Sequence, residues 1–163
     1  MPAPLEATMF AIIPSQPEVG DISPKVWPHV SVMPWVQLGE HRHDVLAEAH
    51  DIVKRHAPIE LRPGGVVTVG GEGHEKQAQT IISKELKKLH IELLYALGSF
   101  GIMVSHPEWA GRNYMPHITS SKRELLRPTA IDSIAVIDNV LMRGDVRGTK
   151  QISAQLGKYD YET

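Results

Sequence analysis

Cysteine is absent from the 163-residue chain, so disulfide bonds and thiolate metal sites are excluded. This absence fits a reducing compartment. No apolar run approaches the length of a transmembrane helix, and the first residues lack the basic-then-apolar order of a secretory signal. These absences predict a cytoplasmic protein without a membrane partner.

A surplus of positive charge is lacking as well. Lysine and arginine total 17 against 19 for aspartate and glutamate, which gives a formal net charge of −2. Proteins that bind long nucleic acids usually carry a basic surplus, because they neutralise many phosphates. The charge balance therefore argues against a long nucleic-acid duplex as a partner. At this length we expect one domain over residues 1–163, present as a monomer.

The chain does contain two copies of one short pattern. Motif 1 (residues 28–31) reads Pro-His-Val-Ser, and motif 2 (residues 116–119) reads Pro-His-Ile-Thr. Side chains alternate along a strand, so the histidine and the hydroxyl of each motif would share one face. A single such triplet is more typical of a histidine on a half-exposed strand. Two copies on neighbouring strands would offer two imidazoles and two hydroxyls to one small anion, without a metal or cofactor.

These residue types suit the hydrolysis of a phosphodiester. A base must take a proton from the attacking water, and an acid must give one to the departing oxygen. Histidine can do both near neutral pH, because its usual pKa is about 6.5. We assign His117 as the base and His29 as the acid, although the symmetry of the motifs leaves the order open. Ser31 and Thr119 would donate hydrogen bonds to the non-bridging oxygens as negative charge develops.

The paired pattern resembles the signature of the 2H phosphoesterase superfamily, which includes 2′,5′-RNA ligase-like proteins and cyclic nucleotide phosphodiesterases. Residues 9–14 resemble its opening strand, residues 114–119 its second motif, and residues 133–140 with 151–159 its terminal strand pair. The resemblance implies a bilobal fold with one motif in each lobe. Two differences stand out. The segment before motif 1 is too short for the long helix that many members have there, and motif 1 carries serine where threonine is commoner.

Other residues near motif 2 are secondary candidates. Lys122 and Arg123 follow it closely and could supply charge to the phosphate. Tyr114 and Trp109 precede it and could stack on a base or a ribose. The histidines between positions 41 and 56 form no recognisable ligand set, so we expect no metal site.

The apolar patterns predict an α+β architecture, with helices outside two antiparallel sheets and a cleft between them. A strongly periodic leucine stripe marks the second of two helices, and proline and glycine mark the connections. The predicted elements are strands over residues 7–13, 29–36, 59–61, 66–69, 102–104, 133–140 and 151–159 and at motif 2, helices over 40–56 and 75–97, a loop over 15–28, and a helical turn over 120–126.

The motifs therefore predict a phosphodiesterase acting on small cyclic or 2′-linked nucleotide phosphates, including those at RNA ends. A hydrolase of cyclic oligonucleotide signals is an equally compatible enzyme. A non-catalytic module that binds nucleotides or RNA is the alternative from another class, although a pure binder has no need of two proton-transfer groups. RNA end joining driven by ATP is disfavoured, because no ATP-binding element is visible.

Overall fold

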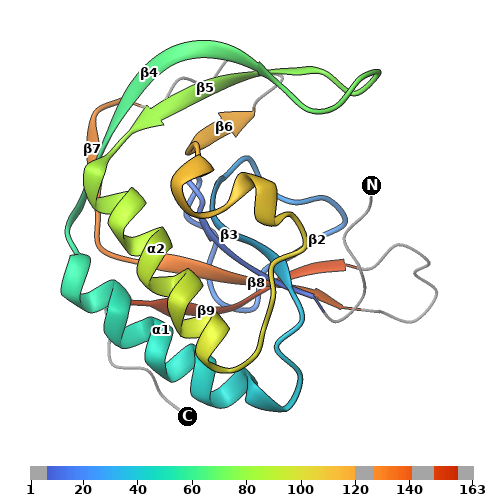
Figure 1. The fold of residues 1–163 in the computed structure, drawn as a ribbon, viewed down its shortest axis with the longest axis vertical. Coiled ribbons are helices and arrows are strands. Elements are labelled where there is room, and N and C mark those ends of the chain that lie inside the picture. Colours follow the sequence, from blue (N-terminus) through green and yellow to red (C-terminus); the bar gives the residue numbers. More distant parts are fainter. Residues whose placement is uncertain (1–6, 120–126, 141–148, 158–163) are drawn as a thin grey trace.

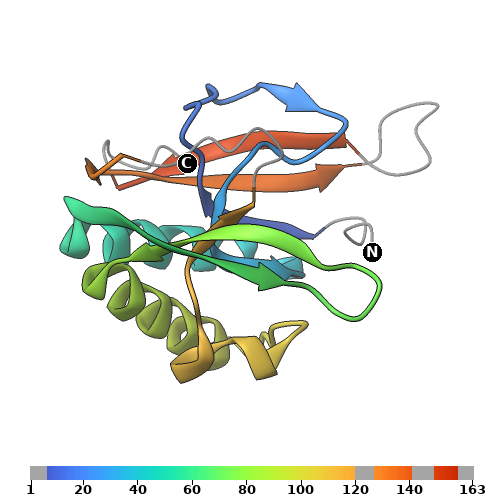
Figure 2. The same cartoon turned by 90° about the horizontal axis from the view of Figure 1, so that it is seen from above.

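The computed structural model describes residues 7–119, 127–140 and 149–157. Its strands form one antiparallel sheet of nine strands in the order β2-β9-β8-β1-β3-β6-β5-β4-β7, and two long helices lie together on one side of it (Figure 1; Figure 2). The strands are β1 (Thr8–Ile12), β2 (Ile22–Ser23), β3 (Val30–Val36), β4 (Ile59–Val69), β5 (Lys76–Ile82), β6 (His117–Thr119), β7 (Thr129–Ile131), β8 (Ile134–Val140) and β9 (Thr149–Leu156). The helices are α1 (Arg42–His56) and α2 (Lys84–Ser99), and the 3₁₀ turns are η1 (Gly39–His41), η2 (Pro107–Trp109) and η3 (Gly111–Asn113). None of the helices in these parts of the chain is both long and apolar enough to cross a membrane.

The main core lies between the helices and one face of the sheet. The leucine stripe of α2 faces inward as the periodicity predicts, because residues three and four apart share one face of a helix. Each of these side chains is at most 1% exposed, and burying one contributes about 1.5–3 kcal/mol. The members of the stripe are Leu86, Leu89, Leu93 and Leu97.

A second, smaller core lies on the opposite face of the sheet, over β1, β8 and β9. Ala11 and Ile13 of the β1 region are buried there with side chains of β8 and β9. Val26 and Trp27, from the connection before motif 1, pack on this cluster together with Trp35. The connection over residues 15–28 contains no helix, as its length predicts, and it covers this part of the sheet.

The α+β class is confirmed, but the described strands form one continuous sheet where two were expected. The short strand β6 explains the difference. It pairs with β3 on one side and with β5 on the other, so it joins the two halves of the chain into one hydrogen-bonded sheet.

The predicted helix over residues 75–97 is wrong in its first third. Residues 76–82 form β5, which pairs with β4 and β6, and the helix begins only after Ser83. The Ser83 hydroxyl accepts a hydrogen bond from the Leu86 amide at 3.1 Å, which caps the helix N-terminus.

Three smaller predictions also need correction or lie outside the described residues. The strands over 59–61 and 66–69 are one strand, β4, whose pairing with β5 is irregular between Pro63 and Val66. Residues 102–104 form no strand, and the helical turn predicted over 120–126 lies outside the described residues.

Candidate active site

The antiparallel pairing of β3 with β6 brings the two motifs together. Val30 pairs with Ile118, and both are buried against the helices. Extending this register by one residue in each direction places His29 opposite Thr119 and Ser31 opposite His117. Because side chains alternate, these four residues share the face of the sheet opposite the helices, which we call the site face.

The arrangement has approximate twofold symmetry about the Val30–Ile118 pair. Each histidine has a hydroxyl residue directly across from it, and the two histidines are diagonal neighbours, about 7–8 Å apart at their backbones. All four motif side chains are half-buried, so they are shielded in part but remain accessible. Such a site can take one tetrahedral anion between two imidazoles.

Each imidazole makes the same kind of hydrogen bond, to the backbone carbonyl two residues before it. His29 Nδ1 lies 2.7 Å from the carbonyl oxygen of Trp27, and His117 Nδ1 lies 2.8 Å from that of Met115. A carbonyl oxygen only accepts, so Nδ1 is the donor in each ring, and Nε2 is left for proton transfer. The proline of each motif lies between the histidine and this carbonyl. It favours an extended conformation in the residue before it, which explains why the two motifs share it.

Burial lowers the pKa of His29 below its usual value, more than the hydrogen bond to the Trp27 carbonyl raises it. The nearby positive charge of His117 lowers it further. This electrostatic effect follows from the diagonal placement of the two rings. At neutral pH the folded protein therefore favours the neutral form of His29, which can accept a proton.

A buried network on the helix side links β3 to the segment that precedes motif 2. His90 of α2 is 1% exposed, its Nδ1 lies 2.8 Å from the carbonyl oxygen of Val32, and its Nε2 accepts a hydrogen bond from the Gly111 amide at 2.9 Å. Its ring stacks on Tyr114 with centroids 3.9 Å apart. The Tyr114 hydroxyl donates to the backbone carbonyl of Ser31 at 2.7 Å. The network thus ties β3 to the segment that precedes motif 2.

The placement of Tyr114 changes the role expected for it. Its ring packs between His90 and the main core, and burial raises the pKa of its hydroxyl. A ring held in this way positions the backbone of motif 1, so we no longer assign it to stack on a substrate. Sequence reasoning missed His90, although a histidine inside a leucine stripe is a signal that could have found it.

The remaining candidates lie elsewhere or outside the described residues. Trp109 in η2 is 61% exposed, and its ring stacks on that of His106. Its contact with a substrate stays a prediction. Lys122 and Arg123 lie outside the described residues. Among the described residues, no group of three or more His, Cys, Asp or Glu side chains could hold a metal ion.

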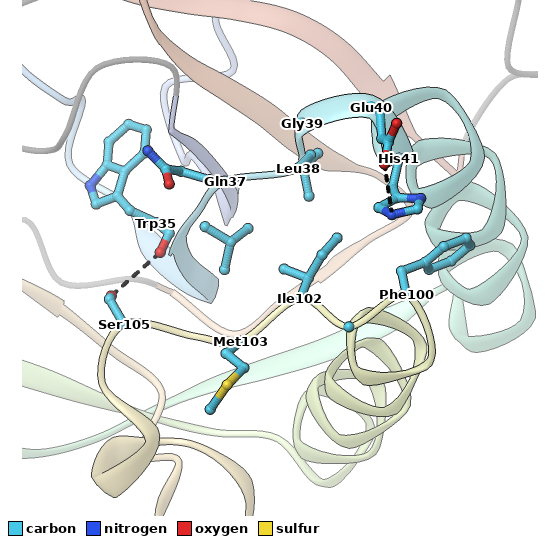
Figure 3. Close-up of a pocket in the computed structure, with 12 residues that line it drawn as sticks. Trp35, Gln37, Leu38, Gly39, Glu40, His41, Phe100, Ile102, Met103 and Ser105 are labelled. Carbon is cyan, nitrogen blue, oxygen red and sulfur yellow. Dashed lines mark hydrogen bonds and ion pairs between the residues drawn. The ribbon is translucent and has the colours of Figure 1, made fainter.

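A groove of about 760 Å³ lies beyond the far end of β3 (Figure 3). Trp35 and Leu38 line it on one side, and Phe100, Ile102 and Ser105 line it on the other. It contains none of the four motif side chains. The groove is therefore separate from the candidate active site.

Two histidines and two hydroxyls lie on neighbouring strands, the arrangement expected for a two-histidine phosphoesterase. A family model described as the 2′-5′ RNA ligase superfamily matches residues 16–141, a range that includes both motifs. The chain belongs to this superfamily of 2H phosphoesterases, which supports a phosphodiesterase-type activity. No curated protein sequence matches the chain. Among solved structures it is similar to the one titled "Crystal Structure of MHV ns2 PDE Domain", with 11% identity, a TM-score of 0.43, and coverage of 93% of this chain and 99% of that one.

Proposed function

We propose that the protein hydrolyses 2′,3′-cyclic or 2′-linked phosphates on small nucleotides or RNA ends, using His29 and His117 as its proton-transfer groups. The observation that carries this proposal is the β3–β6 register, which puts both histidines and both hydroxyls around one position on the site face. The net charge of −2 favours a substrate with few phosphates.

In the proposed reaction, His29 Nε2 takes a proton from water as the water oxygen bonds to phosphorus. One ring P–O bond breaks, and His117 Nε2 donates its proton to the departing ribose oxygen. We exchange the two roles expected from the sequence, because a histidine whose pKa is lowered is better prepared to act as the base. Proton transfer at both ends comes from the protein, so the step does not require a metal.

Ser31 and Thr119 would hold the non-bridging oxygens during this step. Each hydroxyl lies across the strand pair from the histidine of the other motif, so the two donors flank the phosphate position on both sides. Donors that are already in place stabilise the developing charge without further reorganisation.

The proposal is tested by incubating the protein with nucleoside 2′,3′-cyclic phosphates, 2′,5′-linked dinucleotides and cyclic dinucleotides, with and without EDTA. We expect turnover of at least one of the first two classes at a rate that EDTA leaves unchanged. Turnover of cyclic dinucleotides alone would favour the signal-hydrolase alternative. Tight binding of a cyclic phosphate without turnover would favour the binding module, and EDTA-sensitive activity would overturn the metal-independent mechanism.

The lowered pKa of His29 predicts a particular pH profile. A base must be unprotonated, so kcat/KM should fall only as the pH drops through a value below about 6.5. The positive charge of His117 contributes to this lowering, so His117→Gln should raise the pKa of His29. NMR titration of the His29 ring in both proteins measures this change. The assignment of His29 as the base would be contradicted if kcat/KM began to fall at a pH above 6.5. It would also be contradicted if the pKa of His29 did not rise in His117→Gln.

A further inference from the structure

The site face is closed on one side of the two motifs and open on the other. Toward β1, Ala11 pairs with Ser31 and is fully buried, because Val26 and Trp27 pack in the same cluster. No part of a substrate fits over β1 while that cluster is in place. Groups that extend from the reacting phosphate across the sheet can therefore do so only toward β5 and β4.

The register extends the site face across these two strands. Thr80 of β5 pairs with His117, and Ile82, two residues further along, shares its face. Ile82 in turn pairs with Arg62 of β4. The neighbouring residues Leu61 and Ile81 are buried against the helices, which confirms that Arg62 and Ile82 belong to the opposite face. Ile82 is 60% exposed and Arg62 is exposed.

Arg62 is placed to reach beyond the reacting phosphate. Its backbone lies two strands from β6, which is about 10 Å across the sheet. Along the strand direction it lies two residues from the level of the His117–Thr80 pair, which is about 7 Å. Among the described residues it makes no ion pair or side-chain hydrogen bond, and its side chain is exposed. Between it and His117 lie the Thr80 side chain, whose hydroxyl donates to the Gly65 carbonyl at 2.8 Å, and the apolar surface of Ile82.

We propose that the site face over β5 and β4 binds the nucleotide next to the reacting phosphate, and that Arg62 binds that nucleotide's own phosphate group. Ile82 would lie under the ribose or base, and the guanidinium would make charge-assisted hydrogen bonds to the second phosphate. The preferred substrate is then a dinucleotide or longer RNA end that carries a second phosphate. This inference rests on the phosphodiesterase function proposed above.

Three substrates separate the contribution of the second phosphate. They are a mononucleotide 2′,3′-cyclic phosphate, a dinucleotide ending in the same cyclic phosphate, and that dinucleotide with a neutral methylphosphonate as its internal linkage. Arg62→Ala should raise KM about fivefold to tenfold for the charged dinucleotide and less than about twofold for the other two. Arg62→Lys, which keeps the charge but loses the planar fork, should fall between wild type and Arg62→Ala.

Lys87→Ala is the matched control, because it removes one positive charge from an exposed position on α2, on the other side of the sheet. It should leave all three KM values unchanged. If Arg62→Ala alters the three substrates equally, or the wild-type protein does not prefer the charged dinucleotide over the methylphosphonate, the second subsite is wrong while the hydrolase stands. If the wild-type protein hydrolyses none of the three, the proposed function and this inference fall together.

Discussion

Alanine in place of either His29 or His117 should lower turnover of the preferred cyclic phosphate by about 10²–10⁴-fold, because each residue is proposed to transfer a proton in the same step. Both side chains are half-buried on the sheet surface, and within the described parts of the chain each hydrogen-bonds only to a nearby backbone carbonyl. The variants should therefore stay folded. The double variant should be little worse than either single one, since the two groups act as a unit.

Initial rates with matched circular dichroism spectra would measure this effect. His43→Ala is the control, because His43 is an exposed histidine on α1, away from the site face. It should keep wild-type activity. Wild-type turnover in either His29→Ala or His117→Ala would remove that residue from the mechanism.

Variants of the two hydroxyl residues should lose less activity than the histidine variants in the same rate measurements. Ser31→Ala and Thr119→Ala each remove one donor to the phosphate oxygens, so we expect losses of about 10–10³-fold. Ser31→Thr and Thr119→Ser keep the donor and should retain most activity. Equal losses in the alanine and the hydroxyl-exchange variants would indicate a packing role instead.

The local patterns of the sequence predicted much of the fold, and long-range strand pairing explains the main error. The leucine stripe of α2 follows from helical periodicity alone. Residues 75–79 read Glu-Lys-Gln-Ala-Gln, which are good or acceptable helix formers, so propensity favours a helix there. Pairing with β4 and β6 on both sides overrides that preference. Such pairing depends on segments that are distant in the chain, and no local pattern contains it.

The sequence also predicted only part of the candidate site. Alternation along a strand was enough to put His29 beside Ser31 and His117 beside Thr119 on one face each. That the two strands are neighbours, in a register that centres on Val30, required the structure. Arg62 fell in the connection between the strands predicted over residues 59–61 and 66–69, because the proline and two glycines after it are turn residues. Within the continuous strand β4 it becomes part of the site face.

Replacing His90 should cost substantial stability, because its ring bridges two buried backbone groups. Leucine has about the volume of histidine, so His90→Leu should leave no large cavity. It does leave the Val32 carbonyl and the Gly111 amide without their buried hydrogen-bond partner. Each unsatisfied buried group costs about 1–3 kcal/mol, so we expect a loss of about 2–4 kcal/mol in the free energy of unfolding. Urea denaturation measures it, and His43→Leu, at an exposed position on α1, should change stability by no more than about 0.5 kcal/mol.

The same substitution should also change how stability depends on pH. Burial lowers the pKa of His90 more than its hydrogen bond to Val32 raises it, and its Nε2 already accepts the Gly111 amide. Below about pH 6.5 the unfolded chain therefore binds a proton that the folded one resists, so wild-type stability is full above pH 6.5 and falls as the pH drops. His29 adds a similar dependence in both proteins, so the difference between wild type and His90→Leu isolates His90. We expect the variant's stability to decline less steeply below pH 6.5. Parallel curves for the two proteins would mean that His90 titrates normally and that the bond from Gly111 does not hold it neutral.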